Sequence, residues 1–138
     1  MYKIVFLDRA TIAPHIRLRP PAFEHALIEY ERTAPDQVAE RIRDADIVIT
    51  NKAPITAQAL AQAPRVRLIA VAATGTDCVD KAACKARGVV VSNIRGYAVN
   101  TVPEHTFALI FALRRSIVAY RESVLAGLQA VDQRSRVL

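Results

Sequence analysis

The sequence is poor in the residues that bind metals or form disulfide bonds. Its 138 residues include two cysteines, Cys78 and Cys84, and no second Cys or His pair lies at the spacing of a zinc site. Free thiols are typical of proteins in a reducing compartment. We therefore predict free cysteines, no metal site and a cytoplasmic location.

Long hydrophobic runs are also missing. The longest apolar run, residues 106–113, is far shorter than the roughly 20 residues that a membrane span requires. The N-terminal segment MYKIVFLDRA holds a short apolar run between charges, without the long apolar stretch and small-residue cleavage site of an export signal. We expect a soluble protein with no membrane partner.

Basic residues do not cluster, although they are in excess. The net charge is +6, from 19 basic and 13 acidic residues, and phosphate contacts in nucleic-acid complexes are made by Lys and Arg. The arginines are scattered, however, with no basic run beyond Arg114 and Arg115 and no interleaved aromatic residues. A solvated surface is the better interpretation, and we predict no nucleic-acid partner.

Apolar residues make up 52% of the sequence and are arranged in short, nearly continuous runs. Four runs rich in Val and Ile, at residues 3–7, 46–50, 67–72 and 88–92, are typical of strands buried on both faces. Helical spacing predicts helices at 21–28, 36–45, 56–63 and 79–87, with Asp36 and Thr56 as N-caps, and a fifth strand near 28–32. Alternating strands and helices predict an α/β fold, a flavodoxin-like doubly wound parallel sheet of about five strands.

The chain changes character after Gly96. Residues 101–126 read as one long helix, in which Thr101 and Glu104 have capping-box spacing and Pro103 falls in the first turn. Residues 107–113 are apolar on every side, so another chain or domain must cover them. We predict an α/β domain at 1–99, a long interdomain or dimerisation helix at 100–127, and a frayed tail at 128–138.

Ligands of a doubly wound sheet bind beyond the carboxyl ends of its strands. One such loop contains Thr74 and Gly75 and leads into a helix, so its backbone amides are placed to bind a small carboxylate. The alternative is a tight turn in which Thr76 or Asp77 caps that helix. Another loop offers Lys52, either for an acidic substrate or as a solvated surface charge.

Histidines offer little for acid–base chemistry. His105 lies in the first turn of the predicted long helix beside Glu104, without a nucleophile nearby in sequence, which favours a structural role. His15 and His25 belong to no recognisable constellation. We therefore assign no catalytic residue within the chain.

Three motifs at this spacing resemble one family. The segments TGTD, ARGVVVSN and VPEHTFALI, together with the upstream ADIVITNKAPIT, closely resemble D-isomer-specific 2-hydroxyacid dehydrogenases, especially the glycerate dehydrogenase or hydroxypyruvate reductase branch. The resemblance covers residues 1–127. It implies hydride transfer between NAD or NADP and a small 2-hydroxy or 2-keto acid.

The resemblance also implies roles for particular residues. The substrate carboxylate would be held by the backbone at Thr74 and Gly75, with help from Asn51 and Lys52. The start of the long helix, Thr101 and Val102, would approach the nicotinamide, and helix 101–126 would form a homodimer interface.

The family's catalytic Arg, His and Glu belong to a cofactor domain with no counterpart in this sequence. The four glycines, Gly75, Gly88, Gly96 and Gly127, cannot form a G-x-G-x-x-G turn. We therefore expect a truncated dehydrogenase, inactive by itself. A non-catalytic dimerisation or interaction module is the alternative. A phosphoacceptor receiver domain has the same fold, but Asn51 occupies the place of its required Asp, so we discount it.

Overall fold

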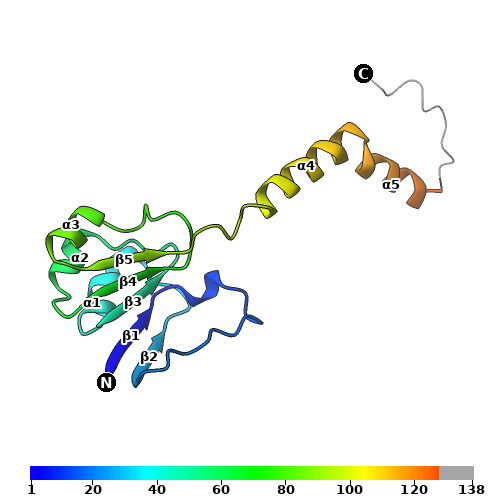
Figure 1. The fold of residues 1–138 in the computed structure, drawn as a ribbon. Helices are drawn as coiled ribbons and strands as arrows, with labels where there is room; N and C mark the ends of the chain where they lie inside the picture. Colours follow the sequence, from blue (N-terminus) through cyan, green and yellow to red (C-terminus); the bar gives the residue numbers. More distant parts are fainter. Residues whose placement is uncertain (128–138) are drawn as a thin grey trace. The chain divides into compact units, whose positions relative to one another are not determined.

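The computed structural model describes residues 1–127 of the protein. The chain divides into two compact units, one from Met1 to Arg95 and a second beginning at Gly96, and each has its own description below. The first unit contains a parallel sheet with strand order β2-β1-β3-β4-β5 (Figure 1). Its strands are β1 (Tyr2–Phe6), β2 (His25–Glu29), β3 (Ile47–Thr50), β4 (Leu68–Val71) and β5 (Val90–Asn93). The predicted α/β fold with five parallel strands is confirmed.

Three short helices connect the later strands. They are α1 (Val38–Ile42), α2 (Ala57–Ala61) and α3 (Lys81–Ala86), and two 3₁₀ turns, η1 (Arg9–Thr11) and η2 (Pro35–Gln37), lie between β1 and α1. Val5, Val48 and Ile69 are neighbours in register on β1, β3 and β4, and all three are fully buried in one core with side chains from the three helices. This row of the sheet, together with the helices, forms the hydrophobic core that positions the strand ends.

The alternate row of side chains lies on the opposite face of the sheet. Leu27, Ile4, Ile47, Leu68 and Val90 are consecutive neighbours in register across the five strands. The edge residues Leu27 and Val90 are 44% and 61% exposed. Within residues 1–95, the core formed with the three α-helices therefore covers one face of the sheet.

One predicted helix is wrong. Residues 21–28, expected to be helical, include four of the five residues of β2, so the fifth strand begins at His25 rather than near residue 28. Residues His25–Glu29 pair in parallel with Tyr2–Phe6, and this pairing with a distant segment overrides the helix-like spacing.

The two predicted N-caps have different outcomes. Thr56 caps α2, because its side-chain oxygen accepts the N–H of Ala59 at 3.2 Å. Asp36 does not cap a helix, since it lies inside η2, and α1 begins after Gln37 without a side-chain cap. The Gln37 side chain instead accepts the N–H of Ala34 at 3.1 Å.

The second unit contains two helices where one was predicted. These are α4 (Thr101–Arg114) and α5 (Ile117–Leu125), and the helical path is interrupted at Ser116, whose φ of 51° lies in the left-handed region. Pro103 lies in the first turn of α4 as expected. The predicted capping box is wrong, because the N-cap is Asn100 and no side chain caps the helix.

Apolar side chains of these two helices are exposed. Neither helix has a buried residue. The large apolar side chains, from 46% to 80% exposed, are Val102, Phe107, Leu109, Ile110, Phe111, Leu113, Ile117, Val118, Tyr120, Val124 and Leu125. In the part of the chain that the structure describes, no helix has the length and apolar character needed to cross a membrane. The predicted frayed tail, residues 128–138, lies outside the described residues.

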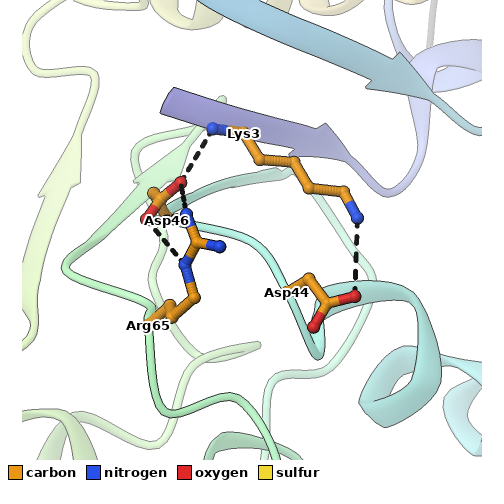
Figure 2. A network of polar contacts seen from close by, with 4 residues as sticks. All are labelled: Lys3, Asp44, Asp46 and Arg65. Carbon is orange, nitrogen blue, oxygen red and sulfur yellow. Dashed lines mark hydrogen bonds and ion pairs between the residues drawn. The ribbon is translucent and has the colours of Figure 1, made fainter. Parts of the chain in front are cut away.

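A polar network joins the amino-terminal ends of the central strands (Figure 2). Asp46, 7% exposed, accepts the backbone N–H of Lys3 at 2.8 Å and three further bonds from the Arg65 guanidinium at 2.8, 3.0 and 3.2 Å. The Lys3 N–H, with the Arg65 guanidinium adding to it, holds the pKa of Asp46 below its ordinary value of 3.8. The ionised carboxylate therefore stabilises the fold.

Asp46→Asn is expected to lower the free energy of unfolding by about 1–3 kcal/mol at pH 7, because charge-assisted hydrogen bonds are lost in a buried place. A depressed folded-state pKa stabilises the wild type above pH 3.8, and this stabilisation is lost as the pH falls through the folded-state pKa. Urea unfolding at pH 7 and at pH 3 measures both effects. Asp44→Asn is the control, since Asp44 is 67% exposed in its ion pair with Lys3. An Asp46→Asn chain as stable as the wild type at pH 7 would contradict this interpretation.

Candidate functional site

The carboxyl ends of the strands meet at one edge of the sheet. Because all five strands are parallel, the loops that follow β1, β3, β4 and β5 begin at this edge (Figure 1). The strand order changes direction between β1 and β3, since β2 lies on one side of β1 and the later strands lie on the other. In open α/β sheets, ligands bind at such a switch point.

A buried carboxylate organises the loop after β3. Asp8 follows β1, is 5% exposed, and accepts the backbone N–H groups of Asn51, Lys52 and Ala53 at 2.9, 2.5 and 2.9 Å. The Thr50 hydroxyl lies 3.4 Å from the same carboxylate and donates to the Ala53 carbonyl at 2.9 Å. Three consecutive amides of this loop are therefore occupied by a side chain of the protein itself.

The side chains of this loop remain available. Asn51 is half-buried and Lys52 is exposed. Lys52 lines an open hollow of about 400 Å³ at the ends of β1 and β3, together with Asp8, Ala10, Thr11, Arg32, Thr33, Pro35, Ala53 and Pro54. An acidic ligand at this edge would meet the Lys52 ammonium.

The loop after β4 is attached to the end of β5. The Thr74 hydroxyl donates to the Ile94 carbonyl at 3.0 Å, and the Asn93 side-chain amide donates to the Thr74 carbonyl at 2.7 Å. The Ile94 N–H donates to the Ala73 carbonyl at 3.0 Å. These three bonds attach Ala73 and Thr74 to the residues at the end of β5.

The same loop has unused backbone donors. Among residues 1–127, none of the N–H groups of residues 74–77 donates to a protein acceptor. Thr74 and Gly75 are exposed. The φ angle of Gly75 lies outside the left-handed region, and an added Cβ would meet its nearest neighbour, Asp77 Oδ2, at 3.7 Å. The backbone conformation therefore does not require glycine, but glycine leaves the amides uncovered.

The predicted relation of this loop to a helix is wrong. Helix α3 begins at Lys81 and is capped by Asp80, whose carboxylate accepts the Ala83 N–H at 2.9 Å. Thr76 and Asp77 do not cap it, and residues 74–77 precede its first turn. Any anion at this loop would be bound by the free amides and not by a helix terminus.

The structure brings the two loops together. Ile55 and Val79 form an isolated parallel bridge, in which the Ile55 N–H donates to the Cys78 carbonyl at 2.7 Å and the Asp80 N–H donates to the Ile55 carbonyl at 2.9 Å. The Cys78 thiol lies 3.8 Å from the Asn51 carbonyl oxygen. Burial raises the pKa of the Cys78 thiol, which keeps it protonated near neutral pH. Asn51, Lys52, Thr74 and Gly75 therefore belong to two connected loops.

The remaining candidates belong to other elements of the chain. Thr101 and Val102 are exposed in the first turn of α4, in the second unit. His105 is exposed on the same helix. His25 belongs to β2, where its Nδ1 lies 2.8 Å from the Phe23 carbonyl oxygen. Within the described residues, no group of three His, Cys, Asp or Glu side chains is arranged to hold a metal ion.

Sequence reasoning missed the contribution of Asp8 to this edge. The sequence patterns assign Asp8 no role in binding the acid. A charged residue directly after an apolar strand, as in KIVFLD, is the one available signal, and it does not identify the amides that the carboxylate accepts.

Comparisons with known proteins agree on one family. A family model described as "D-isomer specific 2-hydroxyacid dehydrogenase, catalytic domain" matches residues 8–138. A glycerate dehydrogenase of Methylorubrum extorquens is 53% identical over 126 residues, which cover 91% of this chain and 40% of that protein. A hydroxypyruvate reductase of Blautia hydrogenotrophica is 34% identical over 103 residues, covering 72% of this chain and 32% of that protein. The chain thus spans about 40% or less of the length of these curated relatives.

Solved structures have the same fold. The D-lactate dehydrogenase of Aquifex aeolicus, solved with NAD and lactic acid, matches with a TM-score of 0.72 at 22% identity. The match covers 98% of this chain and 40% of that one. At this identity the likeness concerns the fold alone.

Proposed function

This chain belongs to the D-isomer specific 2-hydroxyacid dehydrogenase family, and from that membership we propose that residues 1–99 form the substrate-binding side of such an enzyme. The ligand is a small 2-hydroxy or 2-keto acid. Glycerate is the first acid to test, since a glycerate dehydrogenase is 53% identical over most of the chain.

We place the carboxylate of the acid at the loop that contains Thr74 and Gly75. The observation that supports this choice is the row of N–H groups at residues 74–77 without a protein acceptor among the described residues. Backbone amides are strong donors, and a carboxylate can accept several of them at once. The amides of residues 51–53 are already occupied by Asp8, so Asn51 and Lys52 would contribute through their side chains.

Titration of the ¹⁵N-labelled chain with D-glycerate tests this placement. We expect binding in the millimolar range, about −4 kcal/mol, because a small acid makes few contacts in an open site. The amide resonances of residues 74–77 should shift most. Glycerol, which lacks the carboxylate, is the matched control and should cause no such shift. Shifts confined to other loops would contradict the placement.

The cofactor implied by the family is NAD or NADP. We propose that Thr101 and Val102 contact its nicotinamide end. The residues of this chain do not fit a complete dinucleotide site, because no two of the four glycines have the spacing of a phosphate-binding G-x-G-x-x-G turn. The cofactor's role in the reaction is to exchange a hydride with the acid.

We further propose that the protein acts in the cytoplasm. We also propose that these 138 residues do not catalyse hydride transfer by themselves. This proposal rests on the resemblance, which implies that the catalytic Arg, His and Glu belong to the family's cofactor domain. Steady-state assays with NADPH and hydroxypyruvate should therefore show no turnover, and a rate near the enzyme median of about 10 s⁻¹ would contradict this.

We propose a homodimer formed through α4 and α5. The supporting observation is the set of large apolar side chains on these helices, all at least 46% exposed. Patches of this kind mark interaction surfaces in soluble proteins. A non-catalytic interaction module would use the same surface, and it differs from the first proposal in predicting no binding of the acid.

A further inference from the structure

We propose that Asp8 is a positioning residue that holds both acid-binding loops in place through the backbone of residues 51–53. The proposal rests on the function proposed above, because it needs the acid to bind at this edge. Asp8 would touch neither substrate nor cofactor in this role. Its effect on binding would pass through the loops that it holds.

Asp8 is strongly bonded to the loop after β3. The Asp8 carboxylate is 5% exposed and accepts three consecutive N–H groups at 2.5 to 2.9 Å. Hydrogen bonds to an ionised acceptor are roughly twice as strong as neutral ones. The short Asp side chain leaves little freedom between the carboxylate and the end of β1. The loop after β3 is thereby fixed to the centre of the sheet.

The two loops differ in whether their backbone amides are available to a ligand. Asp8 occupies the amides of residues 51–53, so a substrate carboxylate cannot use them, whereas the amides of residues 74–77 have no acceptor among the described residues. An aspartate in this position thus selects which loop binds the acid through its backbone. It also keeps Asn51 and Lys52 at the edge as side-chain donors.

A displacement of the loop after β3 would also reach the loop after β4. The chain runs from the held residues 51–53 directly to Ile55, which is bonded on both sides to the segment Cys78–Asp80. Residues 74–77 immediately precede that segment. A displacement of the first loop therefore moves one anchor of the second, while the Asn93 and Thr74 bonds hold its other end.

Asp46 provides a matched control. It is also a nearly buried aspartate that accepts a backbone N–H from a neighbouring strand, but it lies at the amino-terminal end of β3, opposite the proposed site. Asp46→Asn should therefore destabilise the fold without changing the affinity for the acid. Asp8→Asn removes a carboxylate of similar burial at the ligand edge.

The experiment is a D-glycerate titration of the wild-type, Asp8→Asn and Asp46→Asn chains, with urea unfolding of each. We expect Asp8→Asn to raise Kd about tenfold or more, because small misplacements of binding groups have large effects. Asp46→Asn should stay within about twofold of the wild type, as expected for a distant site. In the Asp8→Asn chain, the amide resonances of residues 51–53 and 74–77 should both move before ligand is added.

Each outcome decides the proposal. If Asp8→Asn and Asp46→Asn weaken the binding of D-glycerate equally, Asp8 contributes only to stability and the proposal is wrong. An unchanged affinity in Asp8→Asn would also overturn the proposal. If Asp8→Asn does not fold, Asp8→Glu keeps the charge but moves it by one methylene. A positioning role then predicts weaker binding in a folded chain, and wild-type affinity would overturn it. A wild-type chain that does not bind D-glycerate would contradict the proposed function itself, whatever the variants do.

Discussion

Gly75→Val is expected to abolish acid binding while leaving the fold intact. The φ angle of Gly75 is outside the left-handed region, and an added Cβ meets only Asp77 Oδ2, at an ordinary 3.7 Å. A branched side chain at this exposed position would cover the neighbouring amides that we propose as the carboxylate site. We expect the affinity for D-glycerate to fall at least about 30-fold, the equivalent of about 2 kcal/mol.

The free energy of unfolding of Gly75→Val should stay within about 0.5 kcal/mol of the wild type, as for most exposed substitutions. Gly75→Ala is the graded control, because a single methyl group covers less of the backbone. Isothermal titration with D-glycerate and urea unfolding measure the two effects separately. Wild-type affinity in a folded Gly75→Val chain would exclude this loop as the acid site.

Phe111→Asp is expected to convert a homodimer into a monomer. Phe111 is 59% exposed on α4 and lies 6.3 Å, centroid to centroid, from the stacked ring of Phe107. Burying a phenylalanine side chain contributes about 2 kcal/mol, and a two-fold interface counts each substitution twice. The dimer should therefore weaken by about 4 kcal/mol, roughly 1,000-fold in Kd.

Size-exclusion chromatography with light scattering across a concentration series measures this effect. Glu104→Lys is the control, since it changes the charge of an exposed polar residue on the same helix. A wild-type chain that stays monomeric at high micromolar concentration would remove the proposed dimer. If Phe111→Asp dimerises with wild-type affinity, the dimer interface does not include this face of α4.

Much of the sheet was predictable from local patterns. The runs at residues 3–7, 46–50, 67–72 and 88–92 each correspond to a strand. Strands that are buried in a parallel sheet have nearly continuous runs of Val and Ile, which makes them recognisable in the sequence. Strand β2 was not predictable in this way. The apolar residues at 21–28 have helix-like spacing, and the conformation of β2 depends on its pairing with Tyr2–Phe6.

The interruption between α4 and α5 had no signal in the sequence either. Ser116 adopts a left-handed conformation that glycine and asparagine favour far more than serine, so composition gave no reason to end a helix there. The predicted single helix was extended through this point because the apolar residues continue on both sides. Local propensity therefore located the helical segment but not its division.

The candidate site shows the same limit. Asn51, Lys52, Thr74 and Gly75 were selected because they follow strands, and the structure joins their loops through Ile55 and Val79. The contribution of Asp8 depends on a contact across 43 residues to Asn51, which no local pattern records. The free amides of residues 74–77 are likewise a property of the folded backbone and not of residue type.

A structure of the chain with D-glycerate bound is the most direct measurement of the central claim. We expect the carboxylate oxygens to lie within hydrogen-bond distance, about 3 Å, of backbone nitrogens in residues 74–77, with Lys52 on the same side of the ligand. A carboxylate bound in the hollow beside Asp8 and Arg32, away from those nitrogens, would contradict the account.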